Sequence, residues 1–420
     1  MAHPKIDQSQ QVEQAIPAKA SLVMMILLLV FFLGTSDNQM ISPLLLLIAR
    51  DLGYGDQVGD VGTLIFPAYA LAAAAAALVV GPLSDRHGRR KFLLYATILF
   101  SLSLLSSFLI KDAYTLAFAR LFTGFAAGVF STCAIAYVAD FFPYQRRGVA
   151  MSVVQAGYFG ALVIGVPLAN QLGHTLGWRT SFAFFGALSV LAFFLIASLL
   201  PDDARNREPE SIDAKPVTHL DNLKVVFGTR ERVASVAAAF FVSGGFVGFF
   251  SYLGSWLEDS LRLSPSEINL FFVVVGFALV GGAVVAGIVS DKFGKRSLSI
   301  LATLALAPML GLIPGLGWGL VLFACFFVAS LAFAFRQGPL QALATELVPR
   351  RARGSLIAIR NTASQIGIAM ATAISGSLYD SSGYQAVGLF SGAMTLIAGA
   401  CIFLMKEPRN DAVEVGEAAR

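Results

Sequence analysis

Long apolar runs, each about 20 residues in length, alternate with short polar connections along nearly the whole chain. Crossing a hydrocarbon core of about 30 Å takes about 20 helical residues. The pattern therefore predicts an all-α membrane protein with twelve transmembrane helices. Their expected limits are 22–49, 60–82, 92–110, 115–141, 148–170, 178–200, 233–257, 267–290, 298–315, 318–345, 354–378 and 384–405.

One longer polar stretch, residues 201–232, divides these segments into two groups of six. We expect two six-helix bundles, residues 21–200 and 233–405, joined by this cytoplasmic linker. Residues 1–20 and 406–420 are then tails. The first apolar run, at 28 residues, is too long for the apolar region of a signal peptide, so we expect it to remain as a helix.

Composition agrees with this interpretation, because 56% of the 420 residues are apolar and only 13% are charged. Soluble domains carry about 25% charged residues, so a solvated globule is excluded. The basic residues gather in alternate connections, and one side of the membrane keeps only Arg50, Lys111, Arg179 and Arg262. By the positive-inside rule, both termini are expected in the cytoplasm, in a plasma (inner) membrane.

The chain repeats itself at an offset of 206 residues. The run from Gly81 to Arg90 aligns with the run from Gly287 to Arg296, and Asp140 aligns with Glu346. The Gly177-Trp178 pair aligns with Gly383-Tyr384 at the same offset. Two pseudo-symmetric copies of one six-helix unit, with the same orientation in the membrane, are therefore expected.

The repeated segment resembles a signature of the major facilitator superfamily, whose halves are parallel repeats. The run from Gly81 to Lys91 is similar to that family's motif between helices 2 and 3, and Arg120, Gly124 and Gly128 resemble its helix 4 motif. The first half resembles the drug/proton antiporter-like branch. Helix 5 departs from that branch's Gly-Pro-x-x-Gly-Gly pattern, since it contains Gly165-Val-Pro167-Leu-Ala.

The resemblance implies a conformational latch between the halves, in which an Asp meets the positive end of a neighbouring helix. An alternative is that these charges only anchor the topology. An anion at a helix N-terminus gains about 0.3–1 kcal/mol, which favours the latch. Its expected members are Gly81, Asp85, Arg86, Gly88, Arg89, Arg90, Asp140, Arg147, Asp291, Gly294, Glu346 and Arg353.

Ionisable residues within spans are costly and are functional candidates by default. Asp37 in helix 1 and Arg120 in helix 4 are expected at similar depth in the outer half of the same bundle, so a pair is expected. Asp37 is the candidate proton carrier, because burial and a nearby Arg shift a carboxyl pKa in opposite directions. A static ion pair that only joins the two helices is the alternative.

Arg336 in helix 10 and Arg360 in helix 11 have no carboxylate within their own spans. Either they attract an anionic group of a substrate, or they bond carbonyl oxygens and are structural. The expected substrate cavity contains Asn38, Gln39, Gln155, Tyr158, Tyr252, Arg336, Gln337, Arg360, Asn361 and Gln365.

Enzymatic function is not expected, because no catalytic set, metal-spaced cluster or nucleotide-binding phosphate loop is present in the sequence. No cofactor, metal or nucleic-acid partner is expected. Transport would then be driven by a gradient. We expect a monomeric secondary transporter working by alternating access, with proton-coupled efflux of amphiphilic or drug-like molecules. The alternative is a carrier of an anionic metabolite or lysolipid that uses Arg336 and Arg360.

Overall fold

The computed structural model describes residues 18–142, 144–202, 226–348 and 353–405, and these residues form helices and short connections without β-strands. The helices of the first half are α2 (Ala18–Gln39), α3 (Ile41–Asp51), α4 (Val58–His87), α5 (Arg89–Leu105), α6 (Ala113–Phe141), α7 (Tyr144–Gly160), α8 (Val166–Leu176) and α9 (Trp178–Leu199). Those of the second half are α11 (Arg230–Asp259), α12 (Pro265–Phe293), α13 (Lys295–Leu312), α14 (Leu320–Glu346) and α15 (Arg353–Leu404).

Eleven helical segments in the described part of the chain are long and apolar enough to cross a membrane. The longest, α15, has 52 residues and contains Gly383, whose φ of 74° and ψ of 176° are not helical. Because the chain turns at Gly383, α15 supplies two spans. The predicted total of twelve is thereby confirmed. The predicted tails and linker lie largely outside the described residues.

Some expectations about individual spans were wrong. The first span is interrupted at Met40, between α2 and α3. The fifth, expected to end at residue 170, continues to Leu176 in α8. The second does not end near Pro82 but continues through the charged residues to His87. The apolar pattern placed this end too early, because it records where the apolar side chains stop and not where backbone hydrogen bonding stops.

Side-chain caps define the start of one span in each half. The Asp112 side chain accepts a hydrogen bond from the backbone N–H of Thr115, at the start of α6. Ser264 and Glu267 form the same reciprocal arrangement at the start of α12. Such capping boxes satisfy backbone N–H groups that have no partner within the helix.

The internal repeat is visible in the backbone. Gly88 and Gly294, 206 residues apart, have φ of 94° and 82° and join consecutive spans in one residue. Gly177 and Gly383, also 206 apart, have φ of 90° and 74°. Glycine adopts positive φ without a Cβ penalty, which permits these abrupt turns.

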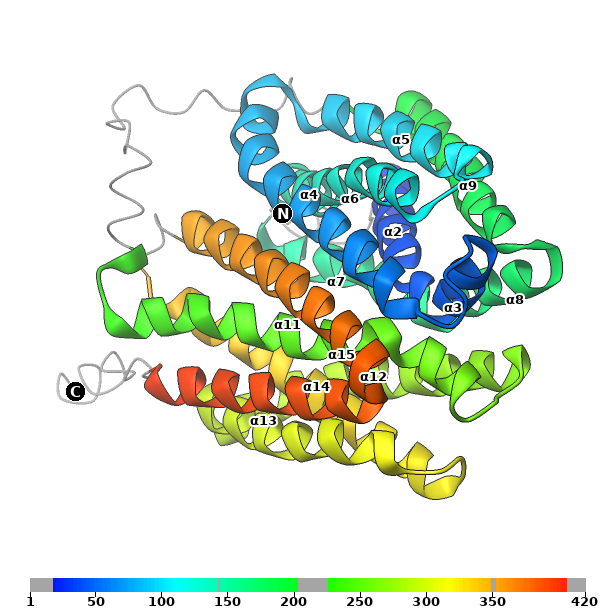
Figure 1. The fold of residues 1–420 in the computed structure, drawn as a ribbon. Helices are drawn as coiled ribbons and strands as arrows, with labels where there is room; N and C mark the ends of the chain where they lie inside the picture. The colour runs from blue at the N-terminus through cyan, green and yellow to red at the C-terminus, as the bar shows by residue number, and fades with distance from the viewer. Residues whose placement is uncertain (1–17, 143, 203–225, 349–352, 406–420) are drawn as a thin grey trace, which may run out of the picture.

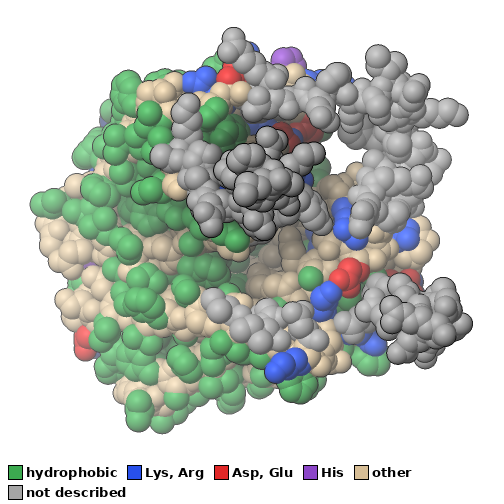
Figure 2. Space-filling view, turned by 180° about the vertical axis from the view of Figure 1, so that it is seen from behind, with side chains coloured by type: hydrophobic (Ala, Val, Ile, Leu, Met, Phe, Trp, Pro, Cys, Tyr) green, Lys and Arg blue, Asp and Glu red, His purple; other side chains and the backbone are tan. Residues whose placement is uncertain are grey.

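The helices form two bundles that lie side by side, one built from α2 to α9 and the other from α11 to α15 (Figure 1). We call the end where α9 ends and α11 begins the base, and the opposite end the closed end. Near the closed end, α3 and α4 of the first half contact α11 and α15 of the second. Hydrophobic side chains cover much of the surface outside these contacts, as Figure 2 shows.

Candidate functional site

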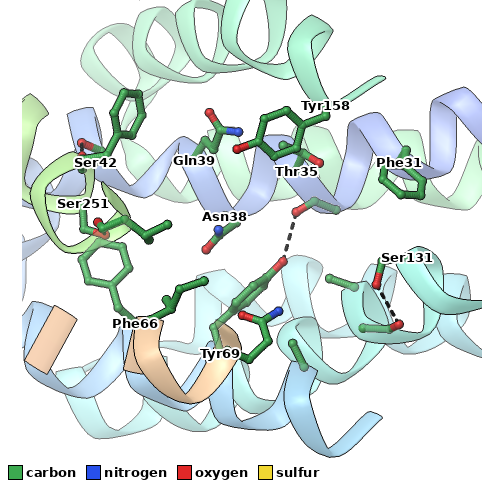
Figure 3. A pocket seen from close by; sticks show the side chains of 18 of the residues that line it. Phe31, Thr35, Asn38, Gln39, Ser42, Phe66, Tyr69, Ser131, Tyr158 and Ser251 are labelled. Atoms are coloured by element: carbon green, nitrogen blue, oxygen red, sulfur yellow. Dashed lines mark hydrogen bonds between the residues drawn. The ribbon is translucent and has the colours of Figure 1, made fainter. Parts of the chain in front are cut away.

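A central cavity of about 270 Å³ lies between the two halves. Its polar wall includes Thr35, Asn38 and Gln39 of α2, and Figure 3 shows Asn38 pointing into the same space as Tyr69 of α4. None of the described lining residues carries a charged side chain. The rest of the lining is largely aromatic and hydroxyl-bearing, and it includes Phe31, Phe66, Phe130, Ser131, Tyr158, Phe246, Phe250, Ser251 and Gln365.

A second cavity of about 310 Å³ adjoins the first on the side of the base. The two share Ala73, Ser131, Gln365 and Ile368 as lining residues. The second is more polar, and its lining also includes Gln337, Gln341, Arg360 and Asn361. Figure 2 shows the surface hollowed between the two halves at the base. The protein therefore has an interior path that reaches from its centre toward the base.

The expected contact between Asp37 and Arg120 is present beside the central cavity. Nη1 of Arg120 lies 2.7 Å from Oδ1 and 2.6 Å from Oδ2 of Asp37. The two side chains are 0% and 1% exposed. The Arg120 guanidinium lies 4.4 Å from the centroid of the Tyr69 ring, and the Tyr69 hydroxyl donates to the Gly34 carbonyl. Tyr69 thus connects the ion pair to the cavity wall.

The two arginines of the second half differ in their surroundings. Nη1 of Arg360 donates to both the carbonyl and the hydroxyl oxygen of Ser235, with a distance of 2.8 Å to the carbonyl. Arg336 is fully buried, and in the described part of the chain no oxygen accepts a hydrogen bond from its Nε, Nη1 or Nη2. The carbonyl-bonding alternative therefore describes Arg360 and does not describe Arg336.

The closed end is held by contacts between the halves. Asp380 of α15 accepts hydrogen bonds from the backbone N–H groups of Gly59 (2.9 Å) and Asp60 (3.0 Å), at the start of α4. The Ser42 hydroxyl donates to the Phe250 carbonyl and accepts from the Gly254 N–H. These bonds block the central cavity from this end.

A second seam of the closed end joins α8 to α12. The Asn170 amide donates to the Asn269 side chain and to the Pro265 carbonyl. Asn170 and Pro265 stand at the repeat offset from Gly376 and Gly59, which contact each other across the α4–α15 seam. The two seams are therefore pseudo-symmetric counterparts.

At the base, the predicted latch residues form matching networks in the two halves. Arg89 pairs with Asp85 at 2.8 Å and with Asp140 at 3.0 Å. In the second half, Lys295 pairs with Glu346, and these two residues stand at the repeat offset from Arg89 and Asp140. The contacts described here lie within each half and fix the span ends of that half.

The other latch residues support the same hairpins. Arg90 donates to the carbonyls of Ile196 and Ala197, and Arg296 donates to that of Phe403. Arg147 donates to the Phe142 carbonyl. Gly81 and Arg86 lie within α4, and Arg353 begins α15. Asp291 lies in α12, but its side chain is outside the described residues.

Most of the predicted cavity residues line a cavity. Asn38, Gln39 and Tyr158 line the central one, Gln365 lines both, and Gln337, Arg360 and Asn361 line the second. Three do not line either cavity. Gln155 is exposed on α7, Arg336 is buried beside the wall, and Tyr252 is buried in the seam between the halves, where its hydroxyl donates to the Thr372 carbonyl.

Sequence reasoning missed Tyr69 and Asp380. A tyrosine within an apolar helix carries no signal of its facing direction, so Tyr69 was not separable from lipid-facing aromatics. Asp380 falls between the predicted spans 354–378 and 384–405, so it was not among the ionisable residues expected within spans. The repeat could have indicated its place, because Asp380 stands 206 residues after His174, which lies at the end of α8.

Two parallel six-helix repeats around a central cavity define a multi-pass membrane carrier. The family model described as Major Facilitator Superfamily matches residues 27–261 and 236–419, and the chain belongs to this superfamily of secondary transporters. It is therefore not an enzyme.

Relatives and solved structures agree with this assignment. The chain is 29% identical over 378 residues to the uncharacterized MFS-type transporter YwfA of Bacillus subtilis (strain 168), with 87% of each chain covered. It is 25% identical over 337 residues to a probable sugar efflux transporter of Helicobacter pylori (strain P12), covering 80% of this chain and 83% of the relative.

The fold matches that of a D-xylose-proton symporter crystal structure, with a TM-score of 0.78, 19% identity, and 94% and 99% of the two chains covered. It also matches an inward-facing bacterial homologue of the human lysosomal transporter Spinster, with a TM-score of 0.74, 17% identity, and 93% and 98% coverage.

Proposed function

We propose that this chain is a proton-coupled transporter that exports amphiphilic, drug-like small molecules by alternating access. The carrying observation is the buried Asp37–Arg120 pair beside the central cavity. The name of the Helicobacter pylori relative, a probable sugar efflux transporter, supports the outward direction. The aromatic cavity favours a cargo with an apolar body.

The pair is suited to a protonation switch. When Asp37 binds a proton, it loses its charge, and the attraction that holds Arg120 weakens. Nε and Nη2 of Arg120 have no hydrogen-bond partner within the described residues, so the guanidinium can take new acceptors when it turns. Its movement would shift Tyr69, which stacks on it and lines the cavity. Proton binding would in this way change the cavity without direct contact between proton and cargo.

The structure corresponds to one step of the cycle, in which the path leads to the base. Following the positive-inside pattern, we assign the base and both termini to the cytoplasm. Cargo would enter the central cavity from this side. The bundles of residues 21–200 and 233–405 would then rock so that the seams at the closed end separate.

The test is efflux from proteoliposomes with an imposed pH gradient, followed with the fluorescent amphiphile 8-anilinonaphthalene-1-sulfonate. Asp37→Asn should abolish gradient-driven transport and retain exchange in the absence of a gradient, because the amide preserves the side-chain shape. Asp112→Asn is a matched control, since asparagine also caps a helix and Asp112 lies at the start of α6. Gradient-driven transport by Asp37→Asn at the wild-type rate would refute the coupling role.

A further inference from the structure

Arg336 is a buried cation with no hydrogen-bond partner among the described residues. Its side chain is 0% exposed, and within the described part of the chain all three guanidinium nitrogens lack an acceptor. Its guanidinium lies over the Phe333 ring, whose centroid is 5.5 Å from Cζ. A guanidinium stays protonated in proteins, so this charge cannot be removed by titration.

The other two buried arginines show how the fold ordinarily treats such a charge. Arg120 is paired with Asp37, and Arg360 donates to two oxygens of Ser235. An uncompensated buried charge strongly destabilises a fold. Among the described residues, Arg336 is therefore the exception, and its charge is free to interact with a bound ligand.

The second half contains no nearby carboxylate to fill this role among its described side chains. Glu258 and Asp259 lie at the closed end of α11, and Glu267 begins α12. Glu346 is ten residues beyond Arg336 on α14, or about 15 Å along the helix, and it pairs with Lys295. Among the described side chains of this neighbourhood there is thus no counter-ion for Arg336.

Arg336 lies next to the walls of both cavities. Phe333, one turn before it, stacks on Phe246 with ring centroids 3.8 Å apart, and Phe246 lines the central cavity. Gln337 and Leu340, which follow it on α14, line the second cavity. The stacked Phe246–Phe333 pair therefore adjoins both the guanidinium and the path of the cargo.

We propose that Arg336 binds the anionic headgroup of an amphiphilic cargo, and that the Phe246–Phe333 pair separates to admit it. The apolar tail of the cargo lies among the aromatic side chains of the central cavity. A guanidinium recognises sulfate, phosphate or carboxylate through two parallel hydrogen bonds. This inference rests on the proposed function, because it takes the ligand of Arg336 to be the cargo of the carrier. It adds that this cargo carries a negative charge.

Ligand-dependent thermal unfolding in lipid nanodiscs tests the proposal, with three probes below any micellar concentration: decyl sulfate, decyltrimethylammonium and methyl sulfate. Only decyl sulfate should raise the melting temperature of the wild type. Stabilisation by decyltrimethylammonium to the same degree would overturn the assigned charge. Equal stabilisation by methyl sulfate would overturn the amphiphilic class, because it would show a site for small soluble anions.

Substitution of Arg336 tests whether this side chain binds the headgroup. Arg336→Met should weaken decyl sulfate binding by about tenfold to one-hundredfold, as expected for lost hydrogen bonds to a charged group. Arg336→Lys should restore part of the affinity. Lys111→Met removes the same charge from an exposed loop and should leave binding unchanged. Undiminished binding of decyl sulfate by Arg336→Met would overturn the proposal.

The melting temperature of the protein without ligand provides an independent test. Because Arg336 has no partner, Arg336→Met should melt no lower than the wild type, so a folding defect is not expected to obscure the binding result. A clearly lower melting temperature would show that the fold already satisfies this charge, which contradicts the proposal. Binding is measured without a gradient, so failure of proton coupling through Asp37 would leave these outcomes unchanged.

Discussion

The three buried arginines look alike in the sequence, but the structure gives them different surroundings. Asp37 and Arg120 were predicted to meet because both lie in the outer half of the same bundle, and the contact is present. The sequence left Arg336 and Arg360 with the same two alternatives. Their difference depends on which side chain reaches a carbonyl oxygen, and helix-facing directions are set by packing that a single sequence does not display.

Breaking the buried pair from either side has a predictable cost. Arg120→Met leaves Asp37 without its partner and should destabilise the protein by about 3–5 kcal/mol. The double variant Asp37→Asn/Arg120→Met should recover much of that loss, because no uncompensated charge remains. Melting temperatures of the single and double variants measure this coupling. Additive effects of the two substitutions would show that the residues do not act as a pair.

Asp51, at the closed end of α3 and outside the spans, should make a pH-dependent contribution to the stability of the fold. Partial burial alone would raise the pKa of its carboxyl group, but hydrogen bonds from Arg179 and Trp178 and the charge of Arg179 outweigh this and lower the pKa from its ordinary value. A lowered carboxyl pKa stabilises the fold above the unfolded pKa, near 4. This stabilisation is lost as the pH falls through the folded pKa.

The corresponding measurement is melting temperature against pH. The wild type should lose more stability than Asp51→Asn as the pH falls from about 5 to about 3. The difference should be small, because the Asp51 side chain is 43% exposed and solvent screens the pair. Parallel curves for the two proteins would exclude a native-state contribution from this carboxylate.

At the scale of elements, the closed end depends on close helix approach. A Cβ on Gly59 would lie 2.2 Å from the Gly376 carbonyl oxygen, so α4 and α15 can meet only where glycine is present. The sequence shows a glycine at position 59 but not its partner, because contacts between halves depend on the conformation of the carrier. The spans themselves were predictable, since apolar runs and terminal glycines are local signals.

Gly59→Ala should therefore prevent full closure of this end and shift the carrier toward the state that is open there. Gly281→Ala is the matched control, because a Cβ at that helical glycine meets no atom within 4 Å. Labelling of a cysteine introduced at Thr35, in the central cavity, by a membrane-impermeant thiol reagent applied at the closed end should increase in Gly59→Ala and stay at the background level in the control. Unchanged labelling in Gly59→Ala would mean that this contact does not limit closure.

At the scale of the whole molecule, the 206-residue repeat accounts for the architecture. It places matched glycine turns at Gly88 and Gly294 and matched ion pairs at the base of each half. The functional charges are not repeated, because Ser243 and Phe326 stand at the offset from Asp37 and Arg120. We infer a division of roles, with the proton switch in the first half and the anion site in the second.

The role of Asp37 as the proton switch can be tested through the distance between the two halves at the closed end, measured by electron paramagnetic resonance between paired spin labels across a range of pH. The wild type should shift between closed and open populations as Asp37 gains a proton. Asp37→Asn should show one pH-independent distribution. An equal pH-dependent shift in Asp37→Asn would contradict the assignment of the Asp37–Arg120 pair as the proton switch.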